Sequence, residues 1–185
     1  MSKNIVILTG DAAEALEVFY PLHRIQEEGW KATVAAPNKK TLQTVVHDFG
    51  PEMETYTEKL GYRIEAEVAI TDTKPSDFDG LVIPGGRAPE YIRNAPGVAD
   101  WVKAFIESGR PVAGTCHAGL LLAKAGVLSG RKCAAYPELA CDIETAGGTF
   151  IDEAVVIDEN LITARAWPDN PQWMREFIQA VHHNG

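Results

Sequence analysis

The sequence contains little cysteine, and this argues against several small-protein and metal-binding architectures. Its three cysteines are Cys116, Cys133 and Cys141, and none of them belongs to a C-x-x-C pair. A disulfide framework or a zinc ribbon requires a regular cysteine spacing, so neither is expected. An odd number of cysteines leaves at least one thiol free. The sequence also shows no adequate cluster of metal ligands, and we expect neither a metal nor an organic cofactor.

Positive charge is also scarce. The chain has 17 Lys and Arg residues against 26 Asp and Glu residues, which gives a formal net charge of -9 at pH 7. Such a surface repels phosphate backbones and anionic lipids, so neither nucleic acid nor a membrane is an expected partner. No apolar run approaches the roughly 20 residues of a membrane span, and the apolar stretch near the N-terminus is too short for a signal peptide. We therefore expect a cytoplasmic protein.

The hydrophobic content is sufficient for one substantial core. Hydrophobic residues make up 45% of the 185 residues, and no linker divides the chain, so residues 1–185 are predicted to form a single domain. Apolar runs typical of buried strands alternate with segments of helical periodicity, which predicts an α/β fold with a parallel sheet between helices. Strands are expected at 5–8, 31–36, 77–83, 111–113, 132–136, 154–157 and 161–164, and helices at 12–29, 97–108, 120–125, 137–146 and 173–183.

Residues 41–71 depart from this alternation. They combine short β-like pieces, at 44–47 and 62–66, with polar turns, and they contain no good helix. This pattern predicts a small β-hairpin and a loop inserted at an edge of the sheet.

The turn at residues 114–119, Gly-Thr-Cys-His-Ala-Gly, joins an expected strand to an expected helix and carries Cys116 at its corner. Ligands of open parallel sheets bind outside the carboxyl ends of the strands, where the loops at 9–13 and 84–90 are also expected. A thiol in the first turn of a helix meets free N–H groups and the positive end of the helix dipole, which stabilise a thiolate. Cys116 is therefore the candidate nucleophile, with a buried structural cysteine as the alternative.

Several motifs, spread over nearly the whole chain, resemble the DJ-1/PfpI superfamily. They lie at 14–21, 81–90 (Leu-Val-Ile-Pro-Gly-Gly-Arg-Ala-Pro-Glu), 111–119, 126–132 (Gly-Val-Leu-Ser-Gly-Arg-Lys) and 135–137 (Ala-Tyr-Pro). The segments at 47–49, 61–63 and 164–168 are more similar to the plant tandem-domain glyoxalase branch than to the archaeal protease branch. The resemblance implies a flavodoxin-like three-layer sandwich, with helices on both faces of the sheet, related to class I glutamine amidotransferases.

The resemblance also implies roles for individual residues. Cys116 matches the nucleophile, and Glu17, four residues before Pro21, matches its acidic partner. Glu14, one helical turn earlier, is the competing choice. A carboxylate and a thiolate in contact cannot easily both be charged, so one of them keeps a proton. His117 matches a histidine of the protease and glyoxalase branches and could relay protons, but the sequence leaves open whether it faces the sulfur.

Further site residues follow from the same motifs. Gly86, with Gly85 beside it and the backbone N–H of His117, resembles the oxyanion hole of the family, and a plain turn is the alternative. Glu90 resembles a carboxylate that the glyoxalase branch places near the substrate. His47 could line the rim of the pocket, but a surface histidine is the favoured interpretation. In the protease branch, the histidine after the nucleophile pairs with an acid from an adjacent subunit, which implies a homo-oligomer, a dimer or a trimer of dimers.

These residues imply a cysteine-dependent, glyoxalase III-like enzyme. It would convert small 2-oxoaldehydes, such as methylglyoxal and glyoxal, to 2-hydroxy acids without glutathione. The alternative is a PfpI-type intracellular cysteine peptidase, because the same groups serve acyl transfer. A deglycase, an isocyanide-hydratase-like enzyme, a chaperone and a redox sensor based on oxidation of Cys116 stay open. A glutamine amidotransferase is disfavoured, since the sequence has no downstream His-x-Glu pair.

Overall fold

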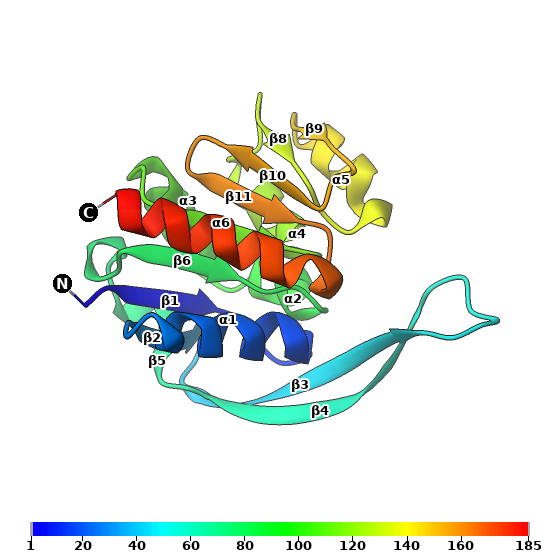
Figure 1. Ribbon diagram of the computed structural model, residues 1–185, viewed down its shortest axis with the longest axis horizontal. Helices are drawn as coiled ribbons and strands as arrows, with labels where there is room; N and C mark the ends of the chain where they lie inside the picture. Colours follow the sequence, from blue (N-terminus) through cyan, green and yellow to red (C-terminus); the bar gives the residue numbers. More distant parts are fainter. Residues whose placement is uncertain (1, 185) are drawn as a thin grey trace.

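The computed structural model describes residues 2–184 and arranges them around a seven-stranded sheet (Figure 1). The strand order is β10-β11-β7-β6-β1-β2-β5, and all neighbouring pairs are parallel except β10 with β11. This sheet confirms the predicted α/β class. Its strands are β1 (Asn4–Leu8), β2 (Lys31–Ala36), β5 (Val68–Ala69), β6 (Gly80–Ile83), β7 (Val112–Thr115), β10 (Val155–Asp158) and β11 (Leu161–Ala164).

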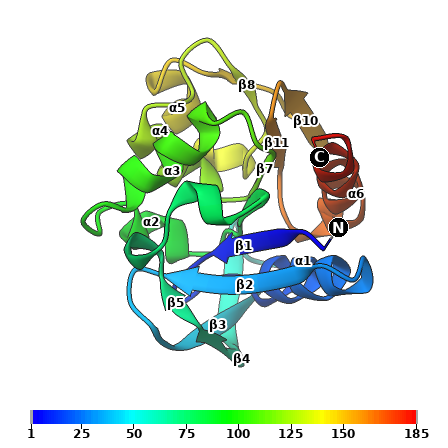
Figure 2. The ribbon, with the colours of Figure 1, turned by 90° about the vertical axis from the view of Figure 1, so that its left-hand side faces the viewer.

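Helices cover both faces of the sheet, because successive residues of a strand point to opposite sides. Ile5 and Ile7 of β1 pack in one hydrophobic cluster with Phe177. Val6 and Leu8 belong to a second cluster on the other side. Figure 2 shows the resulting three-layer sandwich. The first cluster includes α1 (Ala15–Glu27) and α6 (Asn170–His183), and the second includes α2 (Ala88–Ile92), α3 (Val98–Glu107), α4 (Ala118–Ala125) and α5 (Ala140–Thr145).

The predicted hairpin is present, and it is longer than expected. Its strands, β3 (Lys40–Phe49) and β4 (Tyr56–Ala66), are antiparallel and extend well beyond the body of the sandwich (Figure 1). Many of their side chains are exposed, so the sequence shows little of the apolar alternation that marks a half-buried strand.

The base of the hairpin is attached to the loop that follows β1. The N–H of Val45 donates to the carbonyl of Ala13 at 2.8 Å, and the N–H of Ala12 donates to the carbonyl of Gln43 at 2.7 Å. These two hydrogen bonds hold β3 beside a loop at the carboxyl edge of the sheet.

Several element boundaries differ from the expectation. The strand expected at 77–83 begins only at Gly80, and the strand expected at 132–136 is reduced to β8, which pairs with the unpredicted β9. Helix α2 lies where a loop was expected. Three of the short 3-10 helices have proline in their first turn, a position that proline fits because its missing N–H would have no partner there. These elements are β8 (Lys132–Cys133), β9 (Thr149–Phe150), η1 (Ile70–Asp72), η2 (Pro75–Asp77), η3 (Pro137–Leu139) and η4 (Trp167–Asp169).

The strand order reverses at β1. Strands β2 and β5 follow on one side of β1, and β6, β7, β11 and β10 follow on the other. The carboxyl ends of β1, β6 and β7 therefore meet at a topological switch point, the usual ligand site of such sheets. Within residues 2–184, no helix is long and apolar enough to cross a membrane.

The core predicts a clear difference between two substitutions on α6. Phe177 is 0% exposed, and its ring lies so close to β6 that a Cβ on Gly80 would be 2.8 Å away. Phe177→Ala is expected to lower the free energy of unfolding by about 3–5 kcal/mol, because it leaves a cavity. Gln179→Ala, on the exposed side of the same helix, should change it by less than about 0.5 kcal/mol. Urea denaturation measures both, and equal effects would contradict this view of the core.

Candidate active site

Cys116 lies in the turn between β7 and α4, at the carboxyl edge of the sheet. Its φ angle is 56°, in the left-handed region that costs a non-glycine residue about 1–2 kcal/mol. Two backbone hydrogen bonds hold the turn. The N–H of Cys116 donates to Ala164 at 3.2 Å, and its carbonyl accepts from the N–H of Tyr136 at 3.2 Å. The residue is only 2% exposed, so this strained turn places the thiol inside the protein.

Glu17 approaches the thiol from the first turn of α1. It is fully buried, its Oε2 accepts the N–H of Gly85 at 2.8 Å, and its carboxyl group lies beside the Cys116 side chain. Glu14 is turned elsewhere: its Oε1 caps α1, and its Oε2 accepts the N–H of His47 at 2.7 Å. The structure therefore brings Glu17, and not Glu14, to Cys116.

Burial dominates the acid–base properties of the Glu17–Cys116 pair. It raises the pKa of Glu17 to about 8, against the hydrogen bond from Gly85. Burial also raises the pKa of the Cys116 thiol, and the negative charge of Glu17 raises it further, although the N–H groups of Gly86 and His117 lower it. The backbone N–H groups expected to stabilise a thiolate do lower the pKa, but desolvation and the neighbouring carboxylate outweigh their effect.

The pair retains at least one proton at neutral pH, because burial raises the pKa of both groups. The backbone N–H groups of Gly86 and His117 act in the opposite direction on the sulfur and favour its ionised form. The Oε1 of Glu17 is buried and has no hydrogen-bond partner within residues 2–184. With Glu17 neutral, its charge no longer opposes the ionisation of Cys116.

His117 faces the sulfur. Its Nδ1 lies 3.1 Å from the Cys116 Sγ, which answers the question that the sequence left open. The imidazole stacks on the ring of Tyr136, with centroids 5.3 Å apart and an interplanar angle of 19°. Burial lowers the pKa of His117 to about 4, with help from His47 and against Asp142, so the ring is neutral at pH 7. Its position allows a hydrogen bond to the thiolate without a second charge in the site.

The two glycines after β6 allow close contact between three segments. A Cβ on Gly85 would lie 2.5 Å from the Cβ of Cys116 and 2.7 Å from the Oε2 of Glu17. Gly86 has a φ angle of 68°, and a Cβ there would lie 2.3 Å from the backbone nitrogen of Glu14. A side chain at Gly85 would displace the acid or the thiol, and one at Gly86 would displace the backbone of residues 12–14. The backbone N–H groups of Gly86 and His117 lower the pKa of the thiol, against the larger effect of burial.

Two of the predicted residues have surroundings that the sequence did not indicate. Glu90 lies on the exposed side of α2, close enough to Tyr56 to contribute to its raised pKa, but its carboxylate forms no hydrogen bond or ion pair with any residue in 2–184. His47 is not a surface histidine: it is 4% exposed, and its Nε2 lies 2.9 Å from the Glu58 Oε2. The hairpin was expected at an edge of the sheet, and its half next to the turn, which carries His47, is packed against the site.

Tyr56, Tyr136 and the Glu58–Arg87 ion pair complete the surroundings and were missed in the sequence. Tyr56, at the start of β4, has its hydroxyl 3.5 Å from the Nε2 of His117. Arg87 follows Gly86 and donates twice to Glu58, at 2.8 and 2.6 Å. The Ala-Tyr-Pro motif could have indicated Tyr136, but nothing in the sequence signals Tyr56, because its position depends on how the hairpin is placed.

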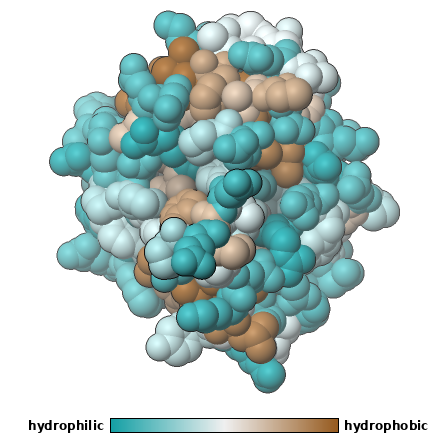
Figure 3. Space-filling model, turned by 90° about the vertical axis from the view of Figure 1, so that its right-hand side faces the viewer, coloured by the Kyte–Doolittle hydropathy of each residue, from teal (hydrophilic) through white to brown (hydrophobic). Residues whose placement is uncertain are grey.

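The surface near the site contains a hollow of about 420 Å³. Tyr136 contributes to it, and the other lining residues are Phe49, Pro137, Glu138, Asp152, Arg165, Ala166, Pro168 and Asp169. The face from which the hairpin projects is mostly hydrophilic, with separate hydrophobic patches (Figure 3).

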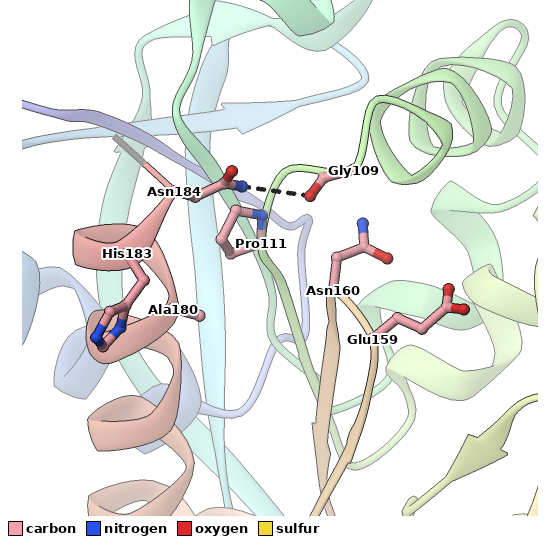
Figure 4. A pocket seen from close by; sticks show the side chains of 7 residues that line it. All are labelled: Gly109, Pro111, Glu159, Asn160, Ala180, His183 and Asn184. Atoms are coloured by element: carbon pink, nitrogen blue, oxygen red, sulfur yellow. Dashed lines mark hydrogen bonds between the residues drawn. The ribbon is translucent and has the colours of Figure 1, made fainter.

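A second hollow, of about 310 Å³, lies where β7 and β11 begin, at the edge of the sheet opposite Cys116 (Figure 4). Asn184 and Gly109, which share a hydrogen bond of 3.3 Å, lie at its margin. No cluster of three or more potential metal ligands occurs among residues 2–184.

The fold and the site define a flavodoxin-like α/β protein with a buried cysteine at a strand-to-helix turn. The model of the DJ-1/PfpI family matches residues 3–180, and the chain belongs to this family. This confirms the resemblance inferred from the motifs.

Relatives with enzyme names cover nearly the whole chain. A deglycase of Thermococcus kodakarensis is 40% identical over 96% of this chain and 99% of its own length. A putative cysteine protease of Bacillus subtilis is 31% identical over 98% of this chain and 99% of its own length. Protein DJ-1 homolog D of Arabidopsis thaliana is 39% identical over 96% of this chain, which spans only 47% of that longer protein.

Among solved structures, a two-domain protein of Anabaena variabilis with DJ-1/ThiJ/PfpI-like and ferritin-like domains is similar to this chain. The TM-score is 0.85 at 27% identity, and the match covers all of this chain and 49% of the other. The similarity supports the fold over the full length of this chain.

The shared proton predicts opposite effects of Glu17→Gln on thiol reactivity and on turnover. The substitution removes the carboxylate charge that raises the pKa of Cys116, so the pH profile of iodoacetamide alkylation should move to lower pH. Any reaction that needs Glu17 to carry a proton should slow. Mass spectrometry of alkylated Cys116 between pH 5 and pH 10 measures the profile. An unchanged profile would show that the two groups do not share a proton.

The close contacts of Gly86 predict that alanine is tolerated less well there than at Gly130. Gly130 has a φ angle of 74° and open space where a Cβ would lie, so Gly130→Ala should cost only the backbone strain of about 1–2 kcal/mol. Gly86→Ala adds a clash with backbone atoms of Glu14 and Ala12, and it should lower stability further and slow alkylation of Cys116. Thermal unfolding and alkylation rates measure both variants. Equal behaviour would exclude a role for this close contact.

Proposed function

We propose that the protein is a glyoxalase III-like enzyme that converts small 2-oxoaldehydes, such as methylglyoxal and glyoxal, to 2-hydroxy acids without glutathione. The observation that carries the proposal is the burial of the reacting groups. Cys116, Glu17 and His117 are 2%, 0% and 6% exposed. A substrate that reaches the thiol must fit a nearly closed space, which suits a two- or three-carbon dicarbonyl better than an extended peptide.

The proposed reaction begins with addition of the Cys116 thiolate to the aldehyde carbon. The carbon–sulfur bond forms while Glu17, protonated because of its raised pKa, gives its proton to the aldehyde oxygen. The product is a neutral hemithioacetal, and Glu17 is now a carboxylate. The N–H of Gly86 is close to the sulfur and can stabilise charge on the substrate oxygen.

The Glu17 carboxylate then takes the hydrogen from the former aldehyde carbon as a proton, which gives an enediolate. Glu17 returns this proton to the neighbouring carbon, a proton passes between the two substrate oxygens, and a thioester of the 2-hydroxy acid results. The aldehyde carbon is oxidised and the ketone carbon is reduced within one molecule. The reaction therefore needs no external oxidant or reductant.

Water completes the cycle. It attacks the thioester carbonyl and gives a proton to Glu17, and the Cys116 thiolate leaves with the 2-hydroxy acid as product. The backbone N–H groups and His117 around the sulfur favour this departure, because they stabilise the thiolate. One water is consumed, and both Cys116 and Glu17 return to their starting states.

A deglycase is the second candidate, and the name of the Thermococcus relative favours it. The same thiol chemistry acts on a carbonyl adduct of an amine or thiol. Such a substrate is larger, and the hollow of about 420 Å³ beside Tyr136 is available for the part that does not react.

The proposal is tested by incubating purified protein with methylglyoxal and measuring lactate by chromatography. The wild type should form lactate without glutathione, and Cys116→Ala should abolish it. Glu17→Gln should reduce the rate by about 10²–10⁴-fold, as for the loss of a general acid–base group. Cys141→Ala removes an exposed thiol and should leave the rate unchanged. No lactate, or a rate independent of Cys116, would refute the glyoxalase. Release of amine from a glycated amino acid, or cleavage of casein, in its place would identify a deglycase or a peptidase.

A further inference from the structure

The end of the hairpin next to its turn places Tyr56 on the side of His117 that faces away from the thiol. The Tyr56 hydroxyl lies 3.5 Å from the imidazole Nε2, and the opposite ring nitrogen, Nδ1, lies 3.1 Å from the Cys116 Sγ. A chain of polar contacts therefore runs from the hairpin through the imidazole to the sulfur. None of the motifs that indicated the site includes Tyr56.

We propose that Tyr56 is a positioning residue that fixes His117 in the tautomer with its proton on Nδ1, so that the imidazole donates a hydrogen bond to the Cys116 sulfur. The inference deepens the proposed function. Of the measurements that test it, only the turnover of methylglyoxal depends on that function. It also gives the inserted hairpin a role in the site.

The direction of the hydrogen bonds follows from the protonation of the two rings. Burial raises the pKa of Tyr56 to about 12, so the phenol keeps its proton and can donate it. Within residues 2–184, the Nε2 of His117 is the hydrogen-bond partner of this hydroxyl. The imidazole is neutral at pH 7, since burial lowers its pKa to about 4, and it carries one proton. When Nε2 accepts from Tyr56, that proton must lie on Nδ1.

The other tautomer is electrostatically unfavourable beside a thiolate. It would direct the Nδ1 lone pair at the negative sulfur, at a separation of 3.1 Å. With the proton on Nδ1, the same contact becomes a charge-assisted hydrogen bond. This bond adds to the two backbone N–H groups at the sulfur and favours the arrangement in which Glu17 holds the shared proton.

Tyr56 is held in place by a group that we call the latch, formed by His47, Glu58 and Arg87. The Tyr56 ring lies against His47, with centroids 4.3 Å apart. The Nε2 of His47 and the guanidinium of Arg87 both bind the Glu58 carboxylate, and the pKa of Glu58 falls to about 2, mainly because of Arg87. Arg87 directly follows Gly86, so the ion pair between Arg87 and Glu58 connects the hairpin to the loop that carries Gly86.

The titratable groups around the His117 imidazole come from several elements, and together with burial they keep its pKa at about 4, so that the ring is neutral at pH 7. His47 from β3 lowers the pKa of His117, and Asp142 from α5 raises it. Around the sulfur, the other titratable group is Glu17 from α1. Glu58 from β4 and Glu90 from α2 act on Tyr56, and both raise its pKa, which keeps the phenol protonated.

The experiment compares the wild type with Tyr56→Phe by ¹⁵N NMR of the histidine side chains and by the pH profile of Cys116 alkylation. In the wild type, His117 should show protonated Nδ1 and unprotonated Nε2. In Tyr56→Phe, the two tautomers should mix, and the alkylation profile should move by about half to one pH unit toward higher pH, the effect of one hydrogen bond. The kcat for methylglyoxal should fall about tenfold with little change in KM. Glu58→Gln, which loosens the latch, should shift the profile in the same direction.

Tyr62→Phe is the matched control, because it removes a hydroxyl from the same strand at a position that is 79% exposed. It should leave the tautomer and the alkylation profile as in the wild type. A wild-type His117 protonated on Nε2, or a Tyr56→Phe profile that coincides with that of Tyr62→Phe, would overturn the proposal. If lactate formation is absent while the tautomer and profile shifts occur, the positioning role stands and the proposed glyoxalase reaction fails.

Discussion

The contact between the Glu17 carboxyl group and the Cys116 thiol, both removed from water, is the constraint on which the site depends. Two negative charges cannot be held there, so the pair retains a proton, and burial raises the pKa of Glu17 to about 8. Backbone N–H groups and the His117 ring lie at the sulfur, and the Glu17 Oε1 has no hydrogen-bond partner within residues 2–184. An acid and a thiol are thereby held together in one buried site.

Such a contact needs three chain segments to meet within a few ångströms, and the sheet supplies this geometry. Strands β1, β6 and β7 are neighbours in the sheet, and the switch point lies between β1 and β6. The segments that follow these strands, namely α1, the glycine turn and the cysteine turn, therefore meet at one edge of the sheet. Gly85 allows the convergence, because a Cβ there would meet Cys116, Glu17 and the His117 backbone nitrogen at once. The positive φ of Cys116 is tolerated because Ala164 and Tyr136 hold the turn on both sides. The strained backbone of Cys116 and the glycines without side chains are thus both found at the candidate active site.

The order of strands and helices and the cysteine turn could be predicted from the sequence, because periodicity and motifs are local signals. The choice between Glu14 and Glu17 could not, since both lie in or next to the first turn of α1 and only packing shows which one points at the sulfur. The direction of the Cys116 pKa shift was missed for a related reason: a helix N-terminus is visible in a sequence, and the depth of burial is not. His47 and Tyr56 belong to strands with exposed neighbours, and their burial arises from the way the hairpin folds back on the site.

The charge balance of the site bears on the kind of carbonyl that it accepts. Glu17 and Cys116 together carry at most one negative charge while they retain a proton, and His117 is neutral. The nearby guanidinium of Arg87 is compensated by Glu58, and Glu90 adds a further negative charge on the outside. A carboxylate-bearing substrate would therefore enter against repulsion in a region where burial weakens screening by solvent. The proposed substrate, an uncharged dicarbonyl, meets no such barrier. The charge balance of the site and the burial of Cys116 therefore both agree with the proposed class of substrate.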